Sequence, residues 1–322
     1  MTLLRIEFEA MSSPCKIVIE SDSASDIESA ALSAKEEILR IERKYSRYEA
    51  SSLISMINQR AGTTEFIEVD KETAYLLTFC EKVYYISEGL LDITSGVLRQ
   101  VWDFSSGQLP EPGEIDSLLP LIGWDKVNWN GENICLTKSG MEIDFGSIGK
   151  EFAADKAAEQ ILERGFRHGF VNVGGDIRVI GPPLSSESWS FGIQHPRSPK
   201  SVIGSINMLR GALATSGDYE RYMEVGGLRY CHVLNPVKGW PVSHWQSISV
   251  VAPTALAAGT LSTLGLLLED RALGLLDREA EAYLGVRHDS EIFCRHASGQ
   301  PLDSIGPRTF SCTESSSDLR EN

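Results

Sequence analysis

The chain is short of basic residues. Its 322 residues include 30 lysines and arginines against 45 aspartates and glutamates, which gives a formal net charge of −15. Proteins that hold the phosphate backbone of nucleic acids gain affinity from Lys and Arg side chains that release counterions. No local block of Lys and Arg offsets the deficit. We therefore expect no nucleic-acid partner, and an anionic ligand must be held by a local site rather than by the overall charge.

Metal-binding, disulfide and secretion signals are also missing. The six cysteines, Cys15, Cys80, Cys135, Cys231, Cys294 and Cys312, form no CxxC pair, and no HExxH motif is present. Such scatter predicts reduced thiols and gives no support to a zinc hydrolase. The first residues meet Glu7 and Glu9 early, and no apolar run of signal-peptide length precedes Cys15. A cytoplasmic protein without a lipid anchor is the expectation.

A single uncharged run, residues 246–268, is long enough to be tested as a membrane span. Pro253 and Gly259 interrupt it, and residues 248–251, three of which are β-branched, predict a strand. A helix over residues 254–268 would be about 22 Å long, whereas the apolar core of a bilayer is about 30 Å thick. We expect a buried strand followed by a buried helix, and no membrane span.

The remaining chain predicts a mixture of helices and strands. Helices are expected over residues 25–45, 73–86, 150–164, 254–268 and 271–280. Strands are expected over residues 16–20, 142–145, 169–173, 177–180, 188–194, 201–208, 222–225, 228–234, 248–251, 283–286 and 292–295. The helices cluster instead of alternating with strands, which favours an α+β fold with mixed sheets. We expect one domain over residues 1–310 and a polar, disordered tail over residues 311–322.

Two glycine-rich segments could bind a ligand. Asp144 precedes a glycine-rich turn at the start of a predicted helix, where backbone N–H groups and Lys150 favour an anion. A solvated turn is the alternative, and Glu151 stands where a Walker A motif has Ser or Thr. The second segment, Asn172-Val-Gly-Gly-Asp176, is either a plain hairpin turn or a place where a ligand approaches the backbone closely.

Two further segments carry a hydroxyl and an imidazole. Thr215-Ser-Gly-Asp-Tyr219 offers Ser216 as a nucleophile, but no GxSxG motif supports a serine hydrolase. His232 lies in a predicted apolar strand before Asn235 and Pro236. It is either a core histidine or, if it faces a ligand, a general base, because its ordinary pKa lies near neutral pH.

In order along the chain, these segments resemble the ApbE family, the FAD:protein FMN transferases, also known as thiamine-biosynthesis lipoproteins. The resemblance is carried by Asp144-Phe-Gly-Ser-Ile-Gly-Lys-Glu-Phe-Ala-Ala-Asp155, Val171-Asn-Val-Gly-Gly-Asp-Ile177, Ala214-Thr-Ser-Gly-Asp-Tyr219, His232-Val-Leu-Asn-Pro236 and Gly239-Trp-Pro241. Further matches are Ser46-Arg-Tyr48, Ser52, Asn58, Asp92-Ile-Thr94, Gly96 and Gln194-His-Pro-Arg197. The likeness extends from about residue 11 to residue 268, most of the chain.

The resemblance implies an enzyme that binds FAD and Mg²⁺. Such enzymes transfer FMN to a Ser or Thr hydroxyl of an acceptor protein through a phosphoester bond and release AMP. Carried over by motif, the flavin contacts are Met11, Tyr48, Leu90, Leu91, Asp92, Asp144, Lys150 and Val233. His232 is the implied base for the acceptor hydroxyl. The implied metal site lies at Ser147 and at Ser262 and Thr263 of the helix after Pro253.

One position departs from the family. Its metal-binding helix reads Ala-Asp-x-x-x-Thr, but this chain reads Ala258-Gly-Thr-Leu-Ser-Thr263, so that Gly259 replaces the aspartate. Mg²⁺ prefers carboxylate oxygen, and the loss should weaken its binding. Water could fill the position in a slow enzyme, or Asp176 or Asp218 could replace the missing acid. Alternatively the protein binds or delivers flavin without transferring it, or it hydrolyses FAD to FMN and AMP.

Overall fold

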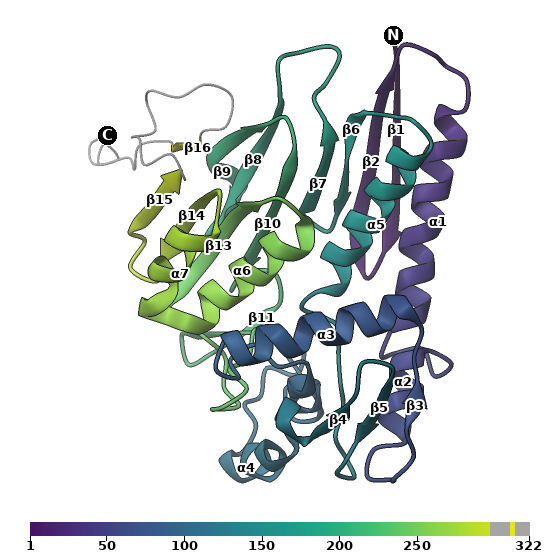
Figure 1. The fold of residues 1–322 in the computed structure, drawn as a ribbon. Helices are drawn as coiled ribbons and strands as arrows, with labels where there is room; N and C mark the ends of the chain where they lie inside the picture. The colour runs from purple at the N-terminus through teal and green to yellow at the C-terminus, as the bar shows by residue number, and fades with distance from the viewer. Residues whose placement is uncertain (297–309, 313–322) are drawn as a thin grey trace, which may run out of the picture.

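The computed structural model describes residues 1–296 and 310–312 and is built on one large antiparallel sheet. The strand order is β1-β2-β6-β7-β10-β13-β14-β15. The strands are β1 (Thr2–Ala10), β2 (Ser13–Ser21), β6 (His168–Val173), β7 (Asp176–Gly181), β10 (Gly211–Gly217), β13 (Trp245–Ala252), β14 (Ala282–Arg287) and β15 (Ile292–His296). All neighbouring strands run antiparallel (Figure 1).

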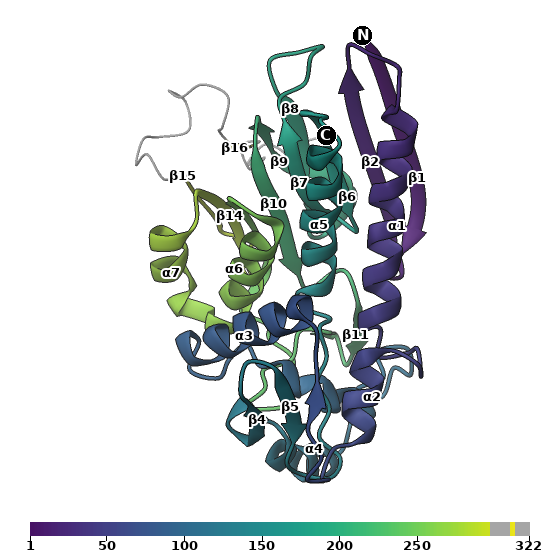
Figure 2. The same ribbon diagram turned by 45° about the vertical axis from the view of Figure 1, so that its right-hand side comes forward.

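Helices cover one face of this sheet, and a small sheet covers the other. Figures 1 and 2 show the helices α1 (Ile27–Tyr45), α5 (Gly149–Glu163), α6 (Ala255–Leu268) and α7 (Ala272–Glu279) side by side. The small sheet consists of β8 (Trp189–His195), β9 (Ser198–Met208) and β16 (Phe310–Cys312). Strand β10 contacts both layers, because Ala212 and Ala214 belong to the core under α5 and α6 while Leu213 packs with β8 and β9. This alternation is the period of two expected of a strand between two layers.

The remaining elements lie mostly at one end of the large sheet, where Figure 1 shows α2, α4, β3, β4 and β5 below α3. They are α2 (Leu53–Gln59), β3 (Ile67–Glu68), α3 (Lys71–Ile86), η1 (Ile93–Gln100), α4 (Pro112–Leu118), η2 (Leu119–Leu121), η3 (Trp124–Lys126), β4 (Val127–Trp129), β5 (Asn133–Leu136), β11 (Tyr222–Val225), β12 (Leu228–Cys231) and η4 (Glu269–Arg271). Strands β3, β5 and β4 form a second small sheet, and β11 pairs with β12.

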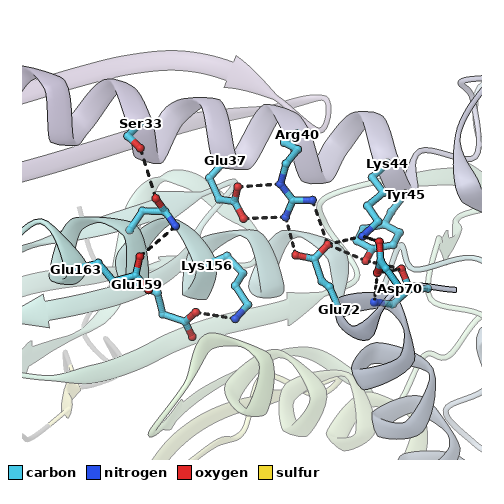
Figure 3. A network of polar contacts seen from close by, with 12 residues as sticks. Ser33, Glu37, Arg40, Lys44, Tyr45, Asp70, Glu72, Lys156, Glu159 and Glu163 are labelled. Atoms are coloured by element: carbon cyan, nitrogen blue, oxygen red, sulfur yellow. Dashed lines mark hydrogen bonds and ion pairs between the residues drawn. The ribbon is translucent and has the colours of Figure 1, made fainter. Parts of the chain in front are cut away.

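A polar network joins the end of α1 to the start of α3 (Figure 3). The Arg40 Nη2 atom lies 2.6 Å from Glu72 Oε2, and Lys44 Nζ lies 2.8 Å from Glu72 Oε1. Lys44 also pairs with Asp70, and the Tyr45 hydroxyl donates to Glu72 at 3.0 Å. Because the network lies at the last turn of α1, it also fixes the place where the chain leaves that helix.

Helices α5 and α6 are joined by a carboxylate. Asp155 of α5 accepts hydrogen bonds from the backbone N–H groups of Ala255 at 2.9 Å and Leu256 at 3.0 Å, which open α6. The Arg178 Nε atom lies 3.3 Å from the same carboxylate. The first N–H groups of a helix have no partner within the helix, so a carboxylate there is favourable. Asp155 therefore fixes the two helices in one antiparallel register.

The α+β prediction is confirmed, and each predicted helix is present with small shifts at its ends. The uncharged run 246–268 forms the fully buried strand β13 and the helix α6, as expected. Within residues 1–296 and 310–312 we find no helix whose length and apolar character would let it cross a membrane. Cys15, Cys80, Cys135 and Cys231 are buried and form no disulfide.

One strand prediction was wrong, another was wrong in part, and several strands lie outside the predicted ranges. Residues 142–145 are not a strand, because Ile143 pairs its N–H and C=O with the side-chain amide of Asn58, at 2.8 and 3.0 Å, instead of with another strand. The strand predicted over residues 228–234 ends at Cys231. The predicted ranges left out β1, an edge strand of the large sheet, and β10 in its interior, as well as the short strands β3, β4, β5 and β16.

The proposed division into a domain over residues 1–310 and a tail stays a prediction. Of the tail, residues 311 and 312 belong to β16, which pairs with β9, and residues 313–322 lie outside the described part of the chain.

Replacing Asp155 by alanine should destabilise the protein by about 2 to 3 kcal/mol. The change removes two charge-assisted hydrogen bonds to buried backbone groups. Urea denaturation followed by circular dichroism measures this loss. The matched control is Glu159→Ala on the same helix, where the side chain is 52% exposed and the expected change is within about 0.5 kcal/mol. A loss for Asp155→Ala as small as that of the control would contradict the assigned role.

Candidate functional site

Two turns meet beside the aliphatic part of Lys150, at the start of α5. Gly174, in the β6–β7 turn, has a φ of 63°, and a Cβ atom built on it would lie 2.8 Å from Ser13 Cβ and 3.3 Å from Lys150 Cδ. The Gly174 N–H donates to the carbonyl of Pro14 at 3.0 Å. A residue without a side chain is therefore required where the β1–β2 turn, the β6–β7 turn and Lys150 touch.

Met11, a predicted flavin contact, lies in this β1–β2 turn. Met11 and Ser12 have φ values of 53° and 55°, which are uncommon for residues other than glycine. The Met11 N–H donates to Glu42 Oε1 of α1 at 2.6 Å and so holds the turn. The structure thus places Met11 in a turn that packs against the β6–β7 turn, beside Lys150.

Tyr48 and Asp144, two further predicted contacts, are joined by Arg47. The Arg47 Nη1 atom donates to Asp144 Oδ2 at 2.6 Å, and Nη2 donates to the Tyr48 hydroxyl at 3.0 Å. Asp144 Oδ1 accepts from the Gly146 N–H at 3.0 Å. The hydrogen bond from Arg47 lowers the pKa of Tyr48, whose side chain is 73% exposed. An exposed ring held by a cation can stack on a planar ligand.

Leu90, Leu91 and Asp92 are buried, and their side chains serve the fold. The Asp92 carboxylate accepts from the N–H and the hydroxyl of Thr94, at 2.8 and 2.7 Å, and from the Trp124 N–H at 3.2 Å. Burial raises the pKa of this carboxyl. A ligand contact in this segment is therefore expected to come from its backbone.

His232, the predicted base, follows the strand β12 instead of lying within it, because β12 ends at Cys231. Its Nδ1 atom lies 3.2 Å from the carbonyl oxygen of Arg221. A carbonyl can only accept, so Nδ1 carries the proton and Nε2 keeps a lone pair. The next residue, Val233, is half-buried.

The electrostatic surroundings keep His232 neutral. Desolvation first, and then the positive charges of Lys150 and Arg221, lower the pKa of His232 to about 4. The side chain is also exposed, so water weakens these effects, but the neutral form still prevails at pH 7.

Two of the predicted metal-binding hydroxyls, those of Ser262 and Thr263 on α6, meet the hydroxyl of Ser216 on β10. Ser262 donates to the carbonyl of Gly259 at 3.0 Å, and Ser216 Oγ lies 2.8 Å from Ser262 Oγ and 3.0 Å from Thr263 Oγ1. Ser147, which is half-buried, lies just before α5. The sequence pointed to Ser216 as a candidate nucleophile, whereas its hydroxyl belongs to this cluster.

The two acids considered as replacements for the missing aspartate differ in their surroundings. Asp218 is held by Arg197 through two contacts of 2.6 Å each. Asp176 lies 4.0 Å from Lys150 Nζ and accepts a hydrogen bond from the Thr215 backbone. Burial, opposed by Lys150, raises the pKa of Asp176 to about 6. Of these two acids, only Asp176 lies beside Lys150.

Comparison with known proteins gives these residues a context. The sequence model of the ApbE family matches residues 11–284. The chain belongs to the ApbE family. It is 32% identical over 274 residues to the FAD:protein FMN transferase of Haemophilus influenzae, which covers 80% of this chain and 78% of that protein. It is 27% identical over 241 residues to the enzyme of the same name from Vibrio cholerae, with 73% and 72% covered.

Solved structures of ApbE proteins have the same fold. The ApbE protein of Thermotoga maritima superimposes with a TM-score of 0.83 at 30% identity, over 91% of this chain and 96% of that one. A histidine-to-glycine mutant of the flavin transferase ApbE from Vibrio cholerae gives a TM-score of 0.81 at 21% identity, with 93% and 98% covered. The resemblance inferred from the motifs is thereby confirmed.

One residue in this ApbE protein was not among the predicted site residues. Glu151 follows Lys150, is only 6% exposed, and is buried on α5 beside four alanines that are almost fully buried, Ala153, Ala154, Ala157 and Ala158. Burial first, and then the nearby Asp176, raise the pKa of Glu151 well above its usual range. The sequence signal for Glu151 was an acid on the buried face of an alanine-rich helix. The residues that surround Glu151 in space are not apparent from the sequence.

The residues present fit a hard metal ion only if hydroxyl or carbonyl oxygens take part. Within residues 1–296 and 310–312 no group of three or more His, Cys, Asp or Glu side chains could hold a metal. The oxygens of Ser147, Ser262 and Thr263, together with one carboxylate, are the type of donor that Mg²⁺ accepts.

We predict that the imidazole of His232 stays neutral well below pH 6.5. Histidine resonances followed by NMR from pH 8 to pH 4, with His232→Gln for assignment, should show a depressed pKa. Between the two pKa values the unfolded chain binds more protons than the native one, so the stability linked to His232 is complete above pH 6.5 and is lost as pH falls toward 4. An ordinary pKa near 6.5 would contradict the described surroundings.

Proposed function

We propose that this protein is an FAD:protein FMN transferase, which moves FMN from FAD to a Ser or Thr hydroxyl of an acceptor protein and releases AMP. The observation that carries the proposal is that the ApbE family model matches residues 11–284, a stretch that includes the motifs with Lys150 and His232. The chain is 32% identical to a Haemophilus influenzae protein of that name.

The reaction is a displacement at phosphorus. The acceptor hydroxyl oxygen forms a bond to the phosphorus of the FMN half, and the bond from that phosphorus to the oxygen of AMP breaks. His232 is suited to accept the hydroxyl proton at Nε2, because its surroundings keep the imidazole neutral. Lys150 supplies positive charge for the diphosphate from the start of α5, where a helix also favours anions.

Other residues bind and orient the flavin in this proposal. Tyr48 offers an exposed ring beside Arg47, and Asp144 holds the guanidinium in place. Met11 and Val233 contribute apolar contacts from their turns. The buried segment of Leu90, Leu91 and Asp92 contributes backbone groups.

Mg²⁺ would be held by oxygens of Ser147, Ser262 and Thr263. When bound, the ion neutralises charge on the diphosphate and on the departing AMP. Ser262 donates its proton to the Gly259 carbonyl and lies 2.8 Å from the Ser216 hydroxyl, so that a second lone pair of its oxygen could serve a cation. The cytoplasmic location expected from the sequence, and a Ser or Thr acceptor in the same compartment, belong to this proposal.

Two other functions use the same site. A flavin-binding or delivery protein would hold FAD without transferring it. An FAD hydrolase would use water in place of the acceptor hydroxyl and give free FMN and AMP. Both alternative functions are considered because Gly259 stands where the family has a metal-binding aspartate.

Incubation with FAD, Mg²⁺ and lysate of the host cells should give a protein band with covalent flavin fluorescence and release AMP. The variant His232→Gln should slow transfer by about 10²- to 10⁴-fold, the usual contribution of a general base, while FAD binding changes little. In-gel fluorescence, chromatography of AMP and flavin titration measure these quantities.

The matched control is His288→Gln, which changes an exposed histidine between β14 and β15. Its transfer rate should equal that of the unaltered protein. FMN and AMP formed without an acceptor would favour the hydrolase, and FAD binding without any product would favour the delivery protein.

A further inference from the structure

We propose that Glu151 supplies the metal-binding carboxylate that α6 lacks at Gly259, so that the acidic ligand comes from the first turn of α5 instead. The identity of the ion as Mg²⁺ rests on the proposed function. The proposal explains two unusual residues together. Glu151 is an acid buried in an alanine-rich helix, and Gly259 is a glycine where the family has aspartate.

The two positions share one volume. A Cβ atom built on Gly259 would lie 2.4 Å from both Cγ and Oε1 of Glu151, and 2.8 Å from Cδ. Real Cβ atoms do not approach other atoms so closely. The Glu151 side chain therefore fills the space in which a side chain at position 259 would lie.

The register of the two helices brings about this contact. Asp155 of α5 binds the N–H of Ala255, the first residue of α6. Glu151 lies one turn before Asp155, and Gly259 lies one turn after Ala255, so the next contact of the antiparallel helices pairs Glu151 with Gly259. Thr263, a further turn along the same side of α6, carries one of the hydroxyls assigned to the metal.

The Glu151 carboxylate lacks the partners that a buried charge requires. The side chain is 94% buried, and its Oε2 atom has no hydrogen-bond partner among the described residues. Asp176 is a second buried acid, and the Lys150 Nζ atom lies 4.0 Å from its carboxylate. Buried carboxylates are normally paired, hydrogen-bonded or bound to a metal ion.

Gly259 is the necessary complement of Glu151. A glycine inside a helix costs about 1 kcal/mol relative to alanine, so it calls for a reason. Here any side chain at 259 would displace Glu151. It follows that Gly259→Asp alone should not restore a family-like site, because the new carboxylate would collide with Glu151.

The first test is Glu151→Gln, which keeps the shape and removes the charge. Calorimetric titration with MgCl₂, with and without FAD, should show at least tenfold weaker Mg²⁺ binding, while the melting temperature without metal does not fall. Glu159→Gln, an exposed acid on the same helix, should bind as the unaltered protein does. Equal affinity in Glu151→Gln, or no Mg²⁺ binding by the unaltered protein in either condition, overturns the proposal.

The second test is a double-mutant cycle between the two positions. Glu151→Ala and Gly259→Asp should each weaken Mg²⁺ binding at least tenfold, and the double variant should regain most of the affinity. Gly265→Ala controls for replacing a glycine in α6, since its Cβ would meet Ile248 and not Glu151. A double variant no better than the weaker single one overturns the proposal, as does tighter binding by Gly259→Asp alone.

These titrations do not depend on flavin transfer. If Mg²⁺ binding depends on Glu151 but no transfer occurs, the proposed function fails and the ligand assignment stands. If transfer occurs and Glu151→Gln keeps its Mg²⁺ affinity, the assignment fails and the proposed function stands.

Discussion

The hydrogen bonds from the start of α6 to Asp155 of α5 are the contact on which the site depends. They satisfy two backbone donors that a helix cannot satisfy itself, and Arg178 balances the charge. Because both helices lie on the same face of the large sheet, this contact also decides which residues face each other one turn away (Figure 2). Lys150 and Glu151 are thereby brought to the end of the sheet where the turns of the site meet.

Because the protein is acidic overall, the positive charges within the site are important for binding an anionic ligand. A protein of net charge −15 must bind a dianionic diphosphate with local cations and helix N–H groups. Several of its cations are engaged with acids, as Arg47 is with Asp144 and Arg197 with Asp218. Lys150 is less tightly held, at 4.0 Å from Asp176, and remains the basic group at the centre of the site.

Much of the fold could be predicted because it rests on local patterns. The buried faces of α1 and α5 follow from apolar residues at helical spacing, and β13 and α6 follow from one uncharged run. The strand predicted over residues 142–145 was wrong because a residue distant in the sequence determines the hydrogen bonds of this backbone. The side-chain amide of Asn58 hydrogen-bonds to the backbone N–H and C=O of Ile143, so residues 142–145 form no strand.

The sequence by itself determined the class of fold and the family, because motifs and periodicity are local properties. It also revealed the missing aspartate at position 259. Only the tertiary structure showed which side chain fills the space that a residue at position 259 would occupy. Glu151 and Gly259 are distant in the chain, and their shared volume arises from the close packing of α5 against α6, which no local pattern encodes.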